Sequence, residues 1–160
     1  MADIKLTTLC YIRSKGNYLM LYRNKKKEDP NGGKWIGVGG HFELCESPDE
    51  CLCREVAEET GLKLTSWQSR GLITFCFDGW GCEYMHLFTA DSFEGKITDC
   101  DEGELAWIPE SELMSLPMWE GDRIFLRLIA EDASYFNLKL CYNKDGVLTD
   151  AILNGEVLAV

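Results

Sequence analysis

The sequence has little positive charge and little proline, and it lacks the paired-cysteine motifs that mark several classes of protein. Lysine and arginine total 16 against 27 aspartate and glutamate residues, which gives a net charge of −11. Proteins that coat nucleic acids neutralise many phosphates with basic side chains, so we expect no nucleic-acid polymer as a partner. With 4 prolines and 15 glycines, the composition is that of a globular protein rather than a fibrous or disordered one.

Long apolar runs are absent as well. No window approaches the roughly 18 uncharged apolar residues of a membrane-spanning helix, and residues 1–5 contain no basic stretch followed by an apolar core. We therefore expect a cytoplasmic protein that does not bind membranes. A length of 160 residues suits a single domain over residues 1–160, present as a monomer or a homodimer.

Eight cysteines are an even number that could form a disulfide framework, but such frameworks belong to shorter secreted chains. No C-x-x-C pair occurs. Cys51 and Cys53 would point about 200° apart on a helix, which does not favour a zinc site. We expect reduced and partly buried thiols.

Alternating apolar residues predict several short strands joined by turns. Residues 122–129 resemble a short helix, and the polar residues 23–33 read as a loop in which Arg23 is a candidate phosphate contact. Many strands with two helices favour an α/β sandwich. The predicted hairpins join residues 4–12 to 18–22 through 14–17, 72–77 to 84–88 through 78–81, and 136–142 to 147–153 through 143–146.

The clearest local signal is the start of a second helix. Ser47 and Glu50 stand three residues apart as in a capping box, and Pro48 occupies the first helical position. Gly61 can adopt the left-handed conformation that ends a helix. We therefore predict a helix over residues 48–60.

This helix gathers negative charge on one face. At 100° per residue, Glu55, Glu58 and Glu59 fall within an arc of roughly 100°. Like charges at these spacings cost a few tenths of a kcal/mol per pair in an isolated helix. The carboxylates form either a solvated acidic face or a site for Mg²⁺, which prefers carboxylates and substrate phosphates. The opposite, packing face is predicted to contain Leu52, Cys53, Val56 and Ala57.

A wider pattern favours the metal site. The sequence reads Gly40-x5-Glu46-x7-Arg54-Glu55-Val56-x-Glu58-Glu59-x-Gly61-Leu62, which resembles the Nudix signature at every fixed position. Nine specified positions over 23 residues make a chance match far less frequent than for a short glycine motif. The resemblance implies a Nudix fold, with a mixed β-sheet sandwiched between helices. It also implies Mg²⁺ or Mn²⁺ as cofactor and hydrolysis of a nucleoside diphosphate linked to another group.

The resemblance also implies roles for individual residues. Arg54 would orient Glu58, and Glu46 would hold the loop. Glu58 and Glu102 are both candidates for the general base, and the sequence does not separate them from purely ligating carboxylates. The implied metal ligands are Glu55, Glu58, Glu59, the carbonyl group of Gly39, and Glu102 in a later loop.

Further segments resemble the oxidised-purine nucleoside triphosphatases of this family, including the MutT-type enzymes. These segments are residues 6–9, 33–40, 71–77, 117–122 and 136–150. The implied reaction converts a triphosphate such as 8-oxo-dGTP to monophosphate and pyrophosphate, which cleans the nucleotide pool and so supports DNA repair. Trp119 would stack on the purine and Asp122 would bind its edge. Other implied substrate-binding residues are Thr8, Trp35, Phe75 and Phe77.

Departures from that subgroup keep other substrates open. Gly121 stands where a second aspartate is usual, and Ile36 stands where an asparagine is usual. Relatives that act on ADP-ribose carry a proline at the place of Phe77, and those that act on dinucleoside polyphosphates carry a tyrosine near Gly79. A nucleotide sugar, ADP-ribose or capped RNA remain alternative substrates. A binding module without turnover is another alternative, although such modules usually lose metal ligands and this signature is complete.

Overall fold

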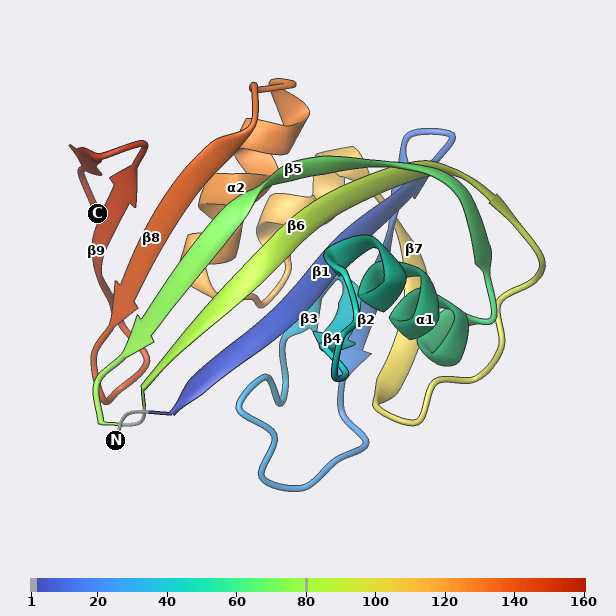
Figure 1. The fold of residues 1–160 in the computed structure, drawn as a ribbon, viewed down its shortest axis with the longest axis horizontal. Coiled ribbons are helices and arrows are strands. Elements are labelled where there is room, and N and C mark those ends of the chain that lie inside the picture. Colours follow the sequence, from blue (N-terminus) through green and yellow to red (C-terminus); the bar gives the residue numbers. More distant parts are fainter. Residues whose placement is uncertain (1–2, 80) are drawn as a thin grey trace.

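The computed structural model describes residues 3–79 and 81–160, so residues 1–2 and Trp80 of the predicted 78–81 turn lie outside the described part. The described chain forms a mixed β-sheet with helices packed on it (Figure 1). The strands are β1 (Ile4–Ser14), β2 (Asn17–Arg23), β3 (Trp35–Ile36), β4 (Val38–His41), β5 (Lys63–Phe77), β6 (Gly81–Glu94), β7 (Gly103–Pro109), β8 (Phe136–Tyr142), β9 (Leu148–Leu153) and β10 (Glu156–Leu158). The helices are α1 (Pro48–Thr60), the short 3₁₀ helix η1 (Glu110–Ser115) and α2 (Glu120–Ala130).

The sheet is mixed because two of its strand pairs are parallel. The strands follow the order β10-β9-β8-β5-β6-β1-β2-β3, with β4 paired to β1 and β7 paired to β2. β1 runs parallel to β6, and β5 runs parallel to β8. Parallel neighbours need long crossover connections. The connection from β1 to β6 contains α1, and the one from β5 to β8 contains α2.

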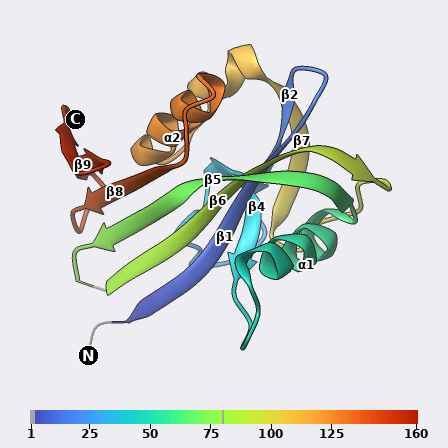
Figure 2. The same ribbon diagram turned by 45° about the horizontal axis from the view of Figure 1, so that its top comes forward.

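The sheet separates two apolar cores. Residues 7–12 of β1 are all buried, which is typical of a strand that is covered on both faces. Tyr11 packs in the core that contains Phe125 of α2, whereas Ile12 packs in the core that contains Val56 of α1. The two helices cover opposite faces of the sheet (Figure 2). The predicted α/β sandwich is therefore confirmed.

The predicted hairpins are present, but two strands are longer than the sequence indicates. β5 begins at Lys63 and β6 ends at Glu94, well outside the predicted ranges 72–77 and 84–88. The register between β5 and β6 shifts between Leu64 and Ser66, and twice more before Gly71. Such bulges interrupt the alternation of inward and outward side chains, which hides the strand from a search for period-two patterns.

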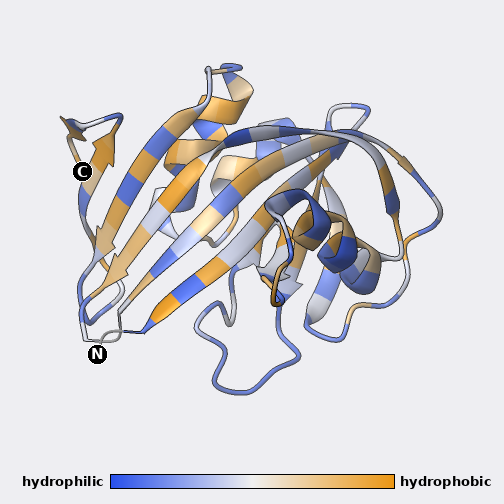
Figure 3. Cartoon of the chain, in the orientation of Figure 1, coloured by the Kyte–Doolittle hydropathy of each residue, from blue (hydrophilic) through white to orange (hydrophobic). Residues whose placement is uncertain are grey.

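The closing hairpin is an integral part of the sheet. β8 lies between β5 and β9, and hydrophobic and hydrophilic residues alternate along it (Figure 3). β9 begins at Leu148, one residue later than predicted. The inward side chains of β8, all exposed by 3% or less, are Phe136, Leu138, Leu140 and Tyr142.

Both predicted helices are present. The helix predicted over residues 122–129 is α2, which covers Glu120–Ala130, and Trp119 is its N-cap residue. Within residues 3–79 and 81–160, no helix is long and apolar enough to cross a membrane.

Candidate active site

Local hydrogen bonds fix α1, the helix that carries the signature glutamates. The Ser47 side chain accepts a hydrogen bond from the Glu50 N–H at 3.1 Å, and Glu50 Oε1 accepts one from the Ser47 N–H at 3.0 Å. At the other end, Gly61 has φ of 79° and its N–H donates to the Ala57 carbonyl. The predicted capping box and C-terminal glycine are both confirmed.

The glutamates of α1 differ in burial, which corrects part of the predicted helix faces. Helical periodicity predicts Glu59 on the face of carboxylates and Ala57 on the packing face, but Glu59 is only 7% exposed and Ala57 is exposed. The buried residues of α1 include Leu52, Val56 and Glu59, at helical spacings of four and three residues. Glu59 therefore points inward, while the Glu58 side chain is 59% exposed.

Arg54 holds the signature together. Its Nε and Nη2 atoms donate to the two carboxylate oxygens of Glu46 at 2.6 and 2.8 Å. Nη1 donates to Glu55 at 2.8 Å and to Glu58 at 3.2 Å, and Nη2 also donates to the His41 carbonyl at 2.9 Å. The side chain of Arg54 therefore joins the loop before α1 to two glutamates of the helix. This includes the predicted pairing with Glu58, although the bonds to Glu46 and Glu55 are shorter.

Glu59 and Glu102 form a carboxylate pair between α1 and the loop before β7. The pKa of Glu59 is raised well above its usual range by burial and then by the neighbouring Glu102 carboxylate. Burial would also raise the pKa of Glu102, but hydrogen bonds with Lys26 and Glu59 and the charge of Arg23 lower it. Arg23 Nη1 lies 2.7 Å from Glu102, and Lys26 Nζ lies 3.0 Å from it. Near neutral pH the pair therefore favours a protonated Glu59 beside an ionised Glu102, which Arg23 and Lys26 already approach.

Two glycines allow β4 to approach both α1 and β1. The Gly39 N–H donates to Glu59 Oε2 at 3.1 Å. A Cβ atom on Gly39 would overlap the Thr8 carbonyl of β1, and one on Gly40 would overlap the Glu55 carboxylate. A side chain at position 39 would therefore force β4 and β1 apart, and one at position 40 would displace the Glu55 carboxylate.

These residues provide the donor chemistry that a hard divalent cation requires. Carboxylate and carbonyl oxygens are the ligands that Mg²⁺ and Mn²⁺ prefer. Among residues 3–79 and 81–160, no three His, Cys, Asp or Glu side chains are already arranged around one point. Arg54 instead pairs with Glu55 and Glu58. The Glu59–Glu102 pair fits a cation, because a buried carboxylate such as Glu59 beside a second carboxylate is stable only when a proton or a positive charge compensates it.

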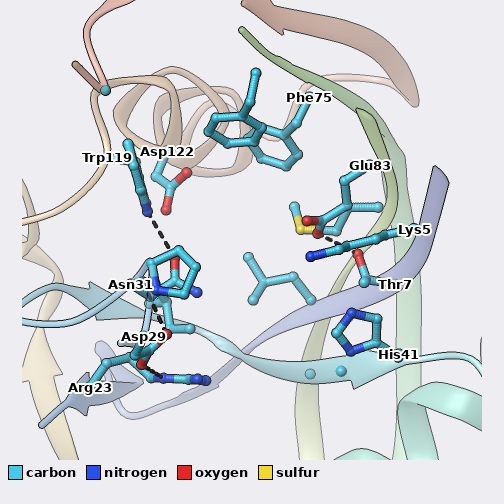
Figure 4. A pocket seen from close by; sticks show the side chains of 18 of the residues that line it. Lys5, Thr7, Arg23, Asp29, Asn31, His41, Phe75, Glu83, Trp119 and Asp122 are labelled. Carbon is cyan, nitrogen blue, oxygen red and sulfur yellow. Dashed lines mark hydrogen bonds and ion pairs between the residues drawn. The ribbon is translucent and has the colours of Figure 1, made fainter. Parts of the chain in front are cut away.

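A cavity of about 400 Å³ lies beside this cluster. Figure 4 shows Trp119, Asp122 and Phe75 at one end and Arg23 and Asp29 at the other. The described residues that line it include Gly39, Gly40 and Glu102, but not the three signature glutamates of α1. Of the predicted substrate-binding residues, the cavity brings together Thr8, Arg23, Phe75, Phe77, Trp119 and Asp122.

Trp119 is fixed from several sides. Its Nε1–H donates to Asn31 Oδ1 at 2.8 Å, and Phe77 and Tyr142 meet its ring edge-to-face. Lys34 Nζ lies 4.4 Å from the centroid of the ring. The indole is therefore held by a hydrogen bond at its edge, by two aromatic rings and by an ammonium group over one face.

Asp122 is buried at the first turn of α2 and lines the same end of the cavity. Burial, followed by the negative charge of Glu83, raises the pKa of Asp122 to about 8.

The structure also explains why position 121 is a glycine rather than a second aspartate. The Gly121 N–H donates to Tyr142 Oη at 2.8 Å, and a Cβ atom on Gly121 would lie 2.5 Å from that oxygen. Tyr142 therefore occupies the space of a side chain at position 121.

Trp35 does not line the cavity in the described structure. Its ring packs against that of Tyr22 with a centroid distance of 5.1 Å, and its backbone N–H donates to the Pro117 carbonyl. Successive residues of a strand face opposite ways, so the neighbouring Ile36 lines the cavity while Trp35 supports the wall. This placement does not support Trp35 as a substrate contact.

Several lining residues were not predicted from the sequence. Lys5, Thr7 and Glu83 form one wall (Figure 4), where Thr7 donates to Glu83 Oε2 at 2.7 Å. The parallel register sets Lys5 opposite Glu83, which no local pattern reveals. Asn31 could have been suspected from its place in the polar loop, but its bond to Trp119 spans 88 positions.

Comparison with known proteins identifies the family. Residues 4–129 match the NUDIX domain. The chain belongs to the Nudix family. Nudix hydrolases generally use a divalent metal ion such as Mg²⁺, so the donor chemistry described above agrees with the family.

The similarity of this Nudix hydrolase to individual relatives extends over most of the chain. It is 32% identical over 130 residues to YvcI, an uncharacterized Nudix hydrolase of Bacillus subtilis, across 76% of this chain and 77% of that protein. It is 32% identical over 133 residues to the oxidized purine nucleoside triphosphate hydrolase of Danio rerio, across 82% and 83% of the two chains. The crystal structure of a MutT protein from Bacillus halodurans superposes with a TM-score of 0.84 at 26% identity, covering 95% of this chain and 99% of that one.

Proposed function

We propose that this Nudix hydrolase converts nucleoside triphosphates with an oxidised purine base, such as 8-oxo-dGTP, to monophosphate and pyrophosphate. The observation that carries the proposal is the continuous cavity, which joins Trp119 and Asp122 at one end to Gly39, Gly40 and Glu102 at the other. A base stacked on the indole would extend its phosphates toward the signature. The similarity to the Danio rerio hydrolase supports the same substrate class. Removal of oxidised nucleotides in this way would protect DNA synthesis.

The phosphate end would bind the metal ion and the water. Mg²⁺ or Mn²⁺ would be held by four carboxylates and one carbonyl group, which belong to Glu55, Glu58, Glu59, Glu102 and Gly39. When bound, the ion would neutralise phosphate charge and acidify a water molecule. Arg23 would contact phosphate, because its guanidinium group lines the cavity and is fixed by Asp29 at 2.7 Å.

We assign the role of general base to Glu58. The side chain of Glu58 is exposed and forms one 3.2 Å ion pair with Arg54. Glu102 is paired with Arg23 and Lys26, which lower its pKa and make it a weaker base. A general base must reach the attacking water and accept its proton, and the exposed carboxylate of Glu58 would be free to turn toward that water.

The base end offers acceptors and a donor for a purine edge. Glu83 and Asp122 line the cavity, and the raised pKa of Asp122 lets its carboxyl group donate as well as accept near neutral pH. The Asn31 oxygen is engaged by Trp119, which leaves its amide N–H groups as the donors. These groups would supply part of the hydrogen bonding to the base that the apolar Ile36 cannot provide.

A substrate screen tests the proposal. The protein is incubated with Mg²⁺ and, separately, with 8-oxo-dGTP, the ordinary nucleotides, ADP-ribose and capped RNA, and the products are identified. We expect the highest kcat/KM with 8-oxo-dGTP, with release of pyrophosphate and monophosphate. Preference for ADP-ribose or capped RNA would replace the proposed substrate. Binding without turnover of any of them would indicate a module that does not act as an enzyme.

Asp122→Ala should reduce purine turnover selectively. The substitution removes polar contacts to the base edge, so kcat/KM for purine triphosphates should fall roughly 10- to 200-fold, a loss of about 1.4–3 kcal/mol. Pyrimidine triphosphates should change little. The measurement is the ratio of kcat/KM for 8-oxo-dGTP to that for dCTP in wild type and variant. Equal losses on both substrates would show that Asp122 serves folding or phosphate chemistry.

Asp122 should also make stability depend on pH. Its folded pKa of about 8 exceeds the unfolded value, so its contribution to the free energy of unfolding is complete below the unfolded pKa. That contribution is lost as the pH rises through about 8. Relative to Asp122→Asn, wild type should therefore lose stability between about pH 4 and pH 8. Urea unfolding of both proteins across this range measures the difference, and parallel stability curves would contradict the burial argument.

A further inference from the structure

Three half-buried cysteines lie side by side on the face of the sheet that is opposite to the cavity. Cys76 of β5 pairs in register with Cys82 of β6 on one side and with Cys141 of β8 on the other. Phe75 and Phe77 line the cavity, so Cys76 between them points to the other face. This thiol row is separate from every group assigned to hydrolysis.

The neighbouring residues place the other two thiols on the same face. Glu83 lines the cavity, and therefore Cys82 next to it points away from the cavity. Leu140 and Tyr142 are buried in the core beneath α2, and therefore Cys141 between them also points away. All three cysteines are partly exposed to solvent.

The strand geometry suits disulfide formation. The Cys82 N–H donates to the Asp3 carbonyl on the side of β1, so Cys76 and Cys82 form a non-hydrogen-bonded antiparallel pair with Cα atoms about 4.5 Å apart. Neighbouring strands lie about 4.8 Å apart, which also applies to the parallel pair of Cys76 and Cys141. Disulfides span Cα separations of about 4.4–6.8 Å. Neither pair requires the backbone to move far.

Cys76 and Cys141 are neighbours across the parallel pair of β5 and β8. Burial raises the pKa of Cys141, and the charge of the neighbouring Cys76 thiol raises it further. Cys45, by contrast, is an exposed free thiol in the loop before α1.

We propose that the thiol row is an oxidation site, at which a hydroperoxide converts Cys76 and Cys141 to a disulfide that thiol reductants reopen. One sulfur attacks the terminal oxygen of the peroxide, the O–O bond breaks, and an alcohol leaves as the sulfur becomes a sulfenic acid. The second sulfur attacks the first, the S–S bond forms, and hydroxide leaves with the thiol proton as water. Two thiols thus lose two electrons and two protons to the peroxide. Cys82 is placed to attack Cys76 afterwards and release Cys141.

Peptide mapping distinguishes the possible disulfides. Trypsin cleaves after Arg70, Lys96, Lys139 and Lys144, so Cys76 and Cys82 fall in peptide 71–96 and Cys141 falls in peptide 140–144. The full-length protein is treated with a hydroperoxide, its remaining thiols are alkylated, and the digest is analysed by mass spectrometry. We expect the two peptides to be linked, and dithiothreitol to separate them. If Cys76 and Cys141 stay as available to alkylation as before treatment, or oxidise only to sulfinic acid as a lone thiol would, the proposal is overturned.

Serine variants test the order of the row. Cys82→Ser should keep the link between the peptides, whereas Cys141→Ser should remove it and leave only an internal disulfide in peptide 71–96. Cys45→Ser is the matched control and should keep the link. Loss of the link in Cys82→Ser would overturn Cys76 and Cys141 as the direct pair. In wild type, oxidation should raise the melting temperature by several degrees, because the disulfide constrains the unfolded chain. If the linked protein melts at an unchanged temperature, the disulfide strains the folded sheet, and the inference that it forms without moving the backbone is wrong.

Discussion

Glu59→Gln should abolish turnover and leave the folded structure intact. The substitution replaces the carboxyl group that Glu59 would offer to the metal by an amide of almost the same volume, and the amide oxygen can still accept the Gly39 N–H that lies 3.1 Å away. Loss of a metal-ligand charge should lower kcat by at least about 10²-fold. Glu58→Gln should have a similar effect, because it removes the proposed base. Steady-state rates at saturating Mg²⁺ and far-UV circular dichroism measure the two properties.

The matched control is Glu112→Gln, which changes an exposed glutamate of η1 outside the signature. It should retain normal kcat. If a folded Glu58→Gln or Glu59→Gln protein keeps a near-normal rate at saturating Mg²⁺, the assignment of these side chains to the metal and the water is wrong.

Removal of residues 133–160 should unfold the domain. This truncation deletes β8 and leaves the hydrogen-bonding edge of β5 unpaired. Burial of one large apolar side chain contributes about 1.5–3 kcal/mol, and β8 buries four large inward side chains. The sum over these four side chains is comparable to the free energy of unfolding of a whole domain, which is about 5–15 kcal/mol. Thermal unfolding followed by circular dichroism should show no cooperative transition.

A shorter truncation after Asn154 provides the comparison. It removes β10 and the exposed Val157 and Val160, but it keeps the hydrogen bond from the Asn137 N–H to Asn154 Oδ1. This protein should melt cooperatively close to the wild-type temperature. A cooperative transition in the longer truncation as well would mean that the core beneath α2 does not need β8.

The parts of the fold that depend on neighbouring residues could be predicted from the sequence. The boundaries of α1 follow from Ser47, Glu50 and Gly61, whose hydrogen bonds or backbone conformation are local. The ends of β5 and β6 could not be predicted, because their bulges depend on how two distant segments pair. β3 and β4 contain only two and four residues, which is too short for a periodic pattern.

The candidate site divides in the same way. The signature identifies Glu55, Glu58 and Glu59 because their spacing lies within one helix. The burial of Glu59 depends on Gly39 and on Glu102, and helical periodicity alone placed it on the wrong face. Similarly, the wall formed by Lys5, Thr7 and Glu83 arises from the register of two parallel strands. Such contacts depend on tertiary pairing, which a single sequence does not reveal.

The parallel pairing of β1 with β6 has a consequence for the newly synthesised chain. β1 is made first, yet residues 4–12 pair with residues 82–90, which leave the ribosome much later. Until then, this buried strand can pair only with β2 and β4. Non-local pairing slows folding and leaves apolar segments open to association. The nascent chain therefore has to be synthesised through residue 90 before both edges of β1 are paired.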